Sequence, residues 1–258
     1  MTDCACGCKV FNSTYIVLFF GISVSSSIHA YADEIATDES VSETISNESL
    51  SDEVIDSLTI DDFVRAYEIS SSDEAFKDLS EDDQNLYMIK LYNEIYESIS
   101  YRVTARYLPS AYENLNSAEK KLVKSYPAQA AQVYTASSLA TKRTEALYKN
   151  GLHNGNGDAF RHTYWNAEMA TMLAGYGSSF NPSNGKTNAK RWADAHEEKK
   201  NQPANEKQMD LFNNNVGRSI VNKKYSSKDL EKKALAKVDA GSCRRIVNNK
   251  VVATTKAR

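Results

Sequence analysis

Residues 80–103 read SEDDQNLYMIKLYNEIYESISYRV, and they are the strongest indication of the fold class. Its apolar residues recur three and four positions apart, which is the spacing of one face of an α-helix. They are Met88, Leu91, Tyr92, Ile95, Ile99 and Val103. The acids that follow Ser80 strengthen the helix start, because the helix dipole favours negative charge in the first turn. The pattern predicts one long helix that ends before Pro109.

Further helices are predicted through most of the remaining chain. Asn116 with Glu119 resembles a capping box and opens a helical region that Pro127 splits and that runs on to Lys149. Later helices are expected at about 158–175, 187–200 and 205–222, with a short one at 227–238.

The C-terminal region predicts the only strands. Two runs rich in β-branched residues, 244–247 and 250–252, flank Asn248-Asn249, a pair that tolerates positive φ. The expected fold is therefore mainly α, a helical bundle-like domain with a small C-terminal β-hairpin.

The N-terminus has the order of parts that is typical of a signal peptide. Lys9 precedes a short apolar run over residues 15–24, and Ala30-Tyr31-Ala32 places small residues before a cleavage site at Asp33. The run is far shorter than the roughly 20 apolar residues of a membrane-spanning helix. We predict cleavage of residues 1–32 and a secreted or cell-wall-associated protein, with no transmembrane segment in the mature chain.

Residues 33–57 are dominated by Ser, Glu, Asp and Thr and contain no aromatic residue. Such a segment buries too little apolar surface to offset the entropy of ordering it, which predicts a disordered acidic linker. A single, mostly helical domain is expected over residues 58–258. Cys243 is the one cysteine outside the predicted signal peptide, which excludes an intramolecular disulfide in the mature chain.

The C-terminal region is strongly basic. Residues 221–258 hold eleven bases and three acids, whereas residues 33–62 hold eleven acids and no base. A basic surface suits an anionic envelope polymer or lipid as a partner, and it equally suits solvation or pairing with the protein's own acids. The bases lack the interleaved aromatic residues of a nucleic-acid groove, which argues against a nucleic-acid partner.

The candidate site residues come from three segments. Asp158 and His162 are four positions apart and share one face of a predicted helix. His196 lies in a second helix, and Asp210 and Asn214 share a face of a third. If these helices pack together, the five side chains form one cluster.

Imidazoles and carboxylates in this number suit a zinc, manganese or iron ion. They equally suit a metal-free pair in which a carboxylate orients a histidine for acid–base chemistry. The His-Glu-x-x-His pattern of zinc proteases is absent. We predict four catalytic residues that are also candidate metal ligands: His162, His196, Asp158 and Asp210.

Four further residues are predicted to bind substrate: Arg161, Asn214, Glu197 and Trp165. Arg161 and Asn214 suit stabilisation of an oxyanion or a phosphate. Structural roles are the alternatives: Asp158 as a helix N-cap, the histidines as buried hydrogen-bonding groups, and Trp165 as part of the core.

Three blocks of this region resemble an uncharacterised bacterial domain family that occurs in secreted and cell-wall-associated proteins and at toxin-like C-termini. They are NGDAFRHTYWNA (156–167), AHE (195–197) and MDLFNNNVGR (209–218), in the order of the family. The resemblance covers a motif core over residues 150–220. It implies a small α-helical domain with a His/Asp-centred pocket, and it implies no particular reaction.

The sequence thus predicts a secreted hydrolase, either metal-dependent or using a His/Asp acid–base pair, that acts on a cell-envelope, lipid or phosphodiester substrate. Two alternatives stay open. One is a non-catalytic cell-surface module in which the His/Asp/Asn cluster is a structural network. The other is a toxin-like effector that acts on another cell.

Overall fold

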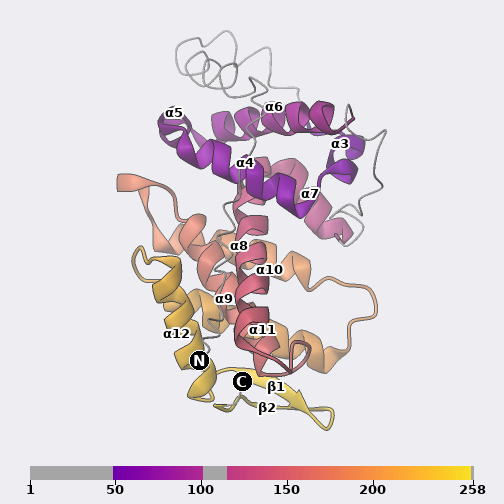
Figure 1. The fold of residues 1–258 in the computed structure, drawn as a ribbon, viewed down its shortest axis with the longest axis vertical. Helices are drawn as coiled ribbons and strands as arrows, with labels where there is room; N and C mark the ends of the chain where they lie inside the picture. Colours follow the sequence, from indigo (N-terminus) through magenta and orange to yellow (C-terminus); the bar gives the residue numbers. More distant parts are fainter. Residues whose placement is uncertain (1–48, 101–114, 257–258) are drawn as a thin grey trace, which may run out of the picture.

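The computed structural model describes residues 49–100 and 115–256 (Figure 1). These residues are mainly α-helical, as predicted, with a two-stranded antiparallel hairpin near the C-terminal end. The helices in these ranges are α3 (Asp52–Ser57), α4 (Ile60–Ser72), α5 (Glu74–Asp78), α6 (Glu81–Ser100), α7 (Ser117–Ser125), α8 (Pro127–Leu147), α9 (Asn156–Met172), α10 (Pro182–His196), α11 (Ala204–Ile220) and α12 (Ser227–Asp239). A short 3-10 helix, η2 (Gly177–Ser179), precedes α10, and the strands are β1 (Arg244–Val247) and β2 (Lys250–Ala253).

Several helix boundaries follow from capping residues. The Asn116 side chain accepts hydrogen bonds at the start of α7, and the Glu119 carboxylate accepts one from the Asn116 N–H at 3.0 Å, so the predicted capping box is confirmed. Pro127 is the first residue of α8, where its missing N–H costs nothing. Helix α10 begins at Pro182, five residues earlier than predicted, because the Asn181 side chain caps it.

The predicted linker is wrong for its last residues. Residues 52–57 form α3, with Ser51 as the N-cap. Leu50, Val54 and Ile55 are buried in the core, and α3 packs against α6. The scattered aliphatic residues therefore bury more surface than their number suggested, because the short helix turns them to one side. The rest of the predicted linker (33–48), the predicted signal peptide and the predicted helix end at 101–108 lie outside the described residues.

The N-terminal helices lie at one end of the molecule and the hairpin at the other, with α8 and α9 between them (Figure 1). Aromatic contacts join the N-terminal helices to α8, since the Phe63 ring lies 5.3 Å from the Tyr92 ring and 4.6 Å from the Tyr134 ring. Across the described ranges, we find no helix with the length and apolar character that crossing a bilayer requires.

Helix α9 is the centre of the fold. It contacts α8, α10, α11 and α12, and 14 of its 17 residues are buried, so its polar side chains lie in the interior. Two glycines on neighbouring helices allow this close packing. A Cβ at Gly185 would lie 2.1 Å from the Ala170 carbonyl oxygen, and one at Gly217 would lie 2.2 Å from the Thr163 carbonyl oxygen. Gly217 therefore brings α11 directly against the backbone of α9.

The predicted hairpin is confirmed, and the side chain of Asn213 in α11 holds its first strand in place. Asn248 and Asn249 adopt positive φ values of 48° and 62° at the turn. The Asn213 amide donates to the Arg244 carbonyl at 2.9 Å and accepts from the Arg244 N–H at 2.8 Å. This side chain pairs with β1 as a neighbouring strand would, which explains one of the three successive asparagines in α11.

Candidate metal centre

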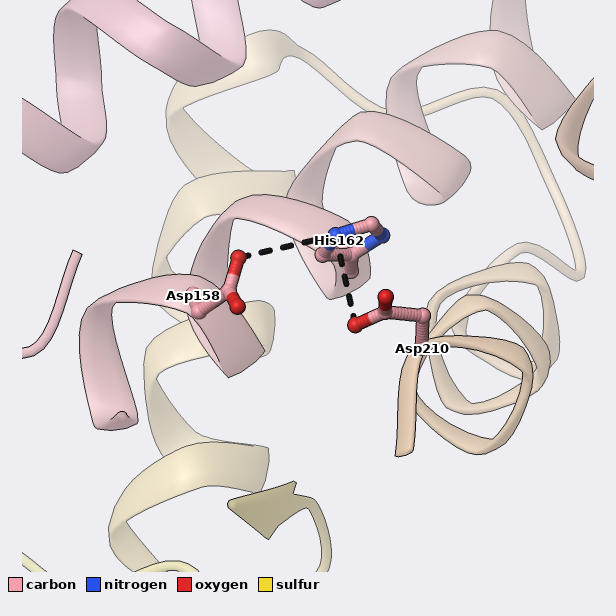
Figure 2. Close-up of side chains that lie close together, drawn as sticks. All are labelled: Asp158, His162 and Asp210. Carbon is pink, nitrogen blue, oxygen red and sulfur yellow. Dashed lines mark ion pairs between the residues drawn. The ribbon is translucent and has the colours of Figure 1, made fainter. Parts of the chain in front are cut away.

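Three of the predicted residues lie together in the interior. Asp158 and His162 come from successive turns of α9, and Asp210 comes from α11 (Figure 2). Nε2 of His162 lies 3.5 Å from Oδ1 of Asp158 and 3.5 Å from Oδ1 of Asp210. One potential ligand atom from each residue lies within 4.8 Å of those of the other two. The exposed fractions are 2%, 2% and 7%. We refer to these residues as the Asp158–His162–Asp210 centre.

Asp158 binds the backbone just before α9 and also belongs to the centre. It is the third residue of α9, whose N-cap is Gly155, so Asp158 is not the N-cap. Its Oδ2 accepts a hydrogen bond from the Asn154 N–H at 2.7 Å, and its Oδ1 accepts one from Arg161 at 2.5 Å. Burial alone would raise the pKa of Asp158. The charge that His162 carries when it is protonated at low pH, the charge of Arg161 and these two hydrogen bonds instead hold the pKa below its usual range.

The hydrogen-bond network sets the tautomer of His162. Asn214 donates through Nδ2 to Glu197 at 3.1 Å, and its Oδ1 accepts from Asn166 at 2.7 Å. That oxygen lies 3.0 Å from Nδ1 of His162, so Nδ1 carries the proton. Nε2 therefore presents a lone pair on the side of Asp158 and Asp210, where it accepts a hydrogen bond from Nη2 of Arg161 at 3.0 Å. Burial, followed by the charge of Arg161, lowers the pKa of His162 from 6.5 to about 4, and the ring is neutral at pH 7.

Asp210 has one paired and one unpaired oxygen. Oδ2 accepts a hydrogen bond from Gln202 at 3.0 Å. Oδ1 is buried and has no hydrogen-bond partner among the described residues. Burial, followed by the negative charges of Glu197 and Asp158, raises the pKa of Asp210 from 3.8 to about 8. An unpaired buried carboxylate oxygen costs free energy unless a proton or a cation compensates it.

A second layer of side chains surrounds the centre. Asn166 donates to Asn214, and Arg218 donates to Oδ1 of Asn166 at 2.7 Å. Glu197, predicted to bind substrate, is instead buried and accepts hydrogen bonds from Asn214 and Gln202. Gln202 and Arg218 lie in this layer and are absent from the predicted site residues. Arg218 ends the MDLFNNNVGR block, but Gln202 lies outside all three blocks and no sequence signal indicates it.

His196 is not part of the Asp158–His162–Asp210 centre, so the prediction of one joint cluster is wrong for this residue. Its Nδ1 donates to Oε1 of Glu119 at 2.8 Å, and Lys199 Nζ lies 2.9 Å from its Nε2. The Trp165 ring separates the two environments, since it contacts the His162 ring at 6.3 Å and the His196 ring at 5.1 Å. Glu119, predicted only as part of a capping box, thus also binds His196 through its second carboxylate oxygen.

A pocket of about 130 Å³ lies next to the centre. Arg161, which contacts Asp158, and Trp165, which contacts the His162 ring, are part of its wall. His196 and Glu119 line the pocket as well. One-third of the Arg161 side chain is exposed, while its Nη2 contacts Oδ1 of Asp158 and lies 3.0 Å from Nε2 of His162. Trp165 is 6% exposed and serves both the core and the pocket wall.

Comparison with known proteins gives a partial match to one family model and no activity. Residues 120–242 match a family described as a domain of unknown function (DUF6973). The match includes the Asp158–His162–Asp210 centre and its second layer. Neither a curated protein nor a solved structure matches the chain.

Proposed function

We propose that the protein is a secreted hydrolase that holds a divalent metal ion between Asp158, His162 and Asp210. The observation that carries the proposal is the buried, unpaired Oδ1 of Asp210, which points at the lone pair of His162. Metal–ligand bonds of about 2.1 Å in a tetrahedral site place ligand atoms about 3.4 Å apart. The two distances of 3.5 Å from Nε2 to the carboxylate oxygens agree with that spacing.

The charges of the site also favour a cation. Asp158, Glu197 and Asp210 bring three carboxyl groups into one buried region, and Arg161 supplies one positive charge at its edge. A divalent ion adds two positive charges, which together with the charge of Arg161 balance three ionised carboxylates. The Nδ1 proton donated to Asn214 supports the same function, because metal-bound histidines usually donate their second nitrogen to a fixed acceptor.

Two carboxylates and one imidazole suit zinc, manganese or iron. Such an ion lowers the pKa of a bound water and polarises a scissile bond, which is the chemistry of hydrolysis. Arg161 contacts two of the three ligand atoms, so ion binding requires its guanidinium to turn towards the adjacent pocket. Envelope lipids, cell-wall polymers and phosphodiesters are the substrate classes of this proposal, and export rests on the N-terminal pattern alone.

A structural role is the second candidate. The chain of hydrogen bonds from His162 through Asn214 and Asn166 to Arg218 joins α9 to α11 and satisfies its own polar groups. This observation favours a non-catalytic module that uses the network to fix its helices. In this candidate a proton on Asp210, whose pKa burial raises to about 8, compensates the buried oxygen in place of a cation.

Metal analysis separates the two candidates. The mature protein, purified without chelator, should contain about one zinc, manganese or iron per chain, and EDTA should lower its melting temperature. Asp210→Asn should lose the metal and the EDTA effect, since an amide is a poor ligand. His153→Gln is the matched control, because the side chain of His153 is 77% exposed and lies outside the centre.

The parent should then hydrolyse at least one member of a panel of lipids, glycans and phosphodiesters, and EDTA should stop the reaction. Absence of metal from the parent, with no melting shift on addition of any of the three ions, would leave only the structural candidate.

A further inference from the structure

The pocket beside the centre has apolar walls and a charged end. Ile60, Leu115 and Trp165 provide apolar surface, and Arg161, Glu119 and His196 provide the polar groups. Its volume of about 130 Å³ is close to that of a cavity that holds one benzene-sized molecule, roughly 150 Å³. The pocket therefore has room for the reacting end of a substrate and a few attached carbons, but not for a whole lipid or glycan.

Arg161 is held at the boundary between pocket and centre. Asp158 fixes one guanidinium nitrogen, and the side chain lines the pocket, where it is one-third exposed. A guanidinium has five N–H donors, so one anchored nitrogen leaves others for a ligand. A planar fork of charged donors in a largely apolar pocket is suited to carboxylate and phosphate oxygens.

A second rigid group borders the same pocket. Glu119 is 4% exposed, and its two oxygens accept from the Asn116 N–H and from Nδ1 of His196. The Asn116 amide also donates to the Ala195 carbonyl at 2.6 Å, which ties the start of α7 to the end of α10. His196 is therefore oriented from both ends, with the Lys199 ammonium beside its Nε2. Two cationic side chains therefore lie near the pocket: Arg161 lines it, and Lys199 lies next to the lining residue His196.

We infer that this pocket binds the phosphoryl group of a phosphate ester, with Arg161 as its principal ligand and the attached carbons against Trp165 and Leu115. The inference rests on the proposed function and names its substrate class. A phosphoryl group offers oxygens to several donors at once, and arginine beside a metal ion is a recurrent way to bind one. Turning of Arg161 towards the pocket, which metal binding requires, brings the guanidinium closer to such a ligand.

The test measures binding of phenyl phosphate to the full mature chain by calorimetry, with inorganic phosphate and benzoate as comparison ligands. Phenyl phosphate should bind more tightly than either, because it alone combines a phosphoryl group with an apolar ring. Arg161→Gln should weaken phenyl phosphate at least about 10-fold, since it removes charge-assisted hydrogen bonds. The matched control is Arg143→Gln, on α8 outside the pocket, where Arg143 pairs with Glu231 at 2.8 Å.

A second variant covers the case in which Arg161→Gln unfolds the protein by leaving Asp158 unpaired. Ser137 also lines the pocket and is only partly buried, so Ser137→Phe should fill the space and abolish binding without touching the charged groups. Unchanged affinity in the Ser137→Phe variant overturns the inference, and so does a preference for benzoate.

The metal-site proposal and the pocket proposal can be contradicted independently of each other. If the chain binds phenyl phosphate in the pocket but contains and takes up no metal, the proposed function fails and the pocket assignment stands. If the metal is present and phenyl phosphate does not bind, the pocket assignment alone fails.

Discussion

His162 and His196 contact the same tryptophan ring, yet they occupy opposite chemical environments. His162 is 2% exposed, and its Nδ1 faces an amide oxygen while its Nε2 faces two carboxylates. The side chain of His196 is 24% exposed and pairs with a single carboxylate, that of Glu119. The first ring is a neutral group with a directed lone pair, as a metal ligand is. The second is an oriented imidazole beside a pocket, as an acid–base or substrate-binding group is.

The difference arises from the helices that carry the two residues. His162 lies in α9, which is surrounded by four helices, so every polar atom there needs a partner within the protein. His196 is the last residue of α10, where solvent reaches part of the ring. The two histidines therefore differ in burial and in hydrogen-bond partners because of the helices that carry them.

The largest expected effect is on metal affinity, and paired asparagine variants measure it. In His162→Asn the amide nitrogen replaces Nδ1, so the hydrogen bond to Asn214 is kept while the ligand atom Nε2 is deleted. We expect the affinity for zinc or manganese to fall by more than about 100-fold, because changes in the second layer alone cost 10–100-fold. His196→Asn keeps the donor to Glu119 and should leave the affinity unchanged. Titration of the chelator-treated protein by calorimetry gives both values, and equal losses in the two variants would contradict the separation of the histidines.

The three successive asparagines of α11 provide the next test. In the metal-free protein, Asn214→Ala should lower the free energy of unfolding by roughly 1–3 kcal/mol, since buried groups of His162, Asn166 and Glu197 lose their partner. Asn213→Ala should cost about 1 kcal/mol, because water can reach the half-buried Arg244 that it leaves. Asn215 is exposed, so Asn215→Ala should stabilise the helix by about 0.5 kcal/mol. Urea denaturation measures the series, and three equal effects would show that the buried network contributes nothing specific.

The sequence predicted most of the fold because its signals are local. Capping at Asn116, the division of the helical region at Pro127 and the turn at Asn248-Asn249 depend on residues within one or two turns of each other, and all three are confirmed. Helix α3 was missed because its stability comes from contacts with α6 rather than from its own composition.

The site was predicted only in part, because some of its contacts are local and others join residues far apart in the sequence. Asp158 and His162 share a helix face, so their spacing is sufficient to pair them. The approach of Asp210 depends on Gly217, whose missing side chain lets α11 lie against the Thr163 carbonyl, and no periodicity encodes that contact. The exclusion of His196 depends on the size of Trp165 and on a carboxylate 77 residues away in the chain.

The remaining expected effect is a pH dependence of stability that arises at the buried Asp158–His162–Asp210 centre. The pKa of Asp210 rises on folding from 3.8 to about 8, so the folded state holds a proton that the unfolded state has lost, and stability falls as the pH rises through that window. The pKa of His162 falls on folding from 6.5 to about 4, so stability rises with pH between about 4 and 6.5. The two slopes oppose each other below pH 6.5. Between pH 6.5 and about 8 only the Asp210 slope remains, and the metal-free protein should lose up to about 1.4 kcal/mol per pH unit.

Denaturation of the chelator-treated protein across pH 5 to 8.5 measures this slope. Asp210→Asn should abolish the loss above pH 6.5, because the amide does not titrate. His162→Gln should extend the loss to lower pH, since the opposing histidine slope is gone, whereas His196→Asn should leave the fall between pH 6.5 and about 8 in place. A saturating divalent ion should also remove the loss, because it binds the ionised form of Asp210 in place of the proton. If the slope survives in Asp210→Asn, another group carries it and the environment assigned to Asp210 is wrong.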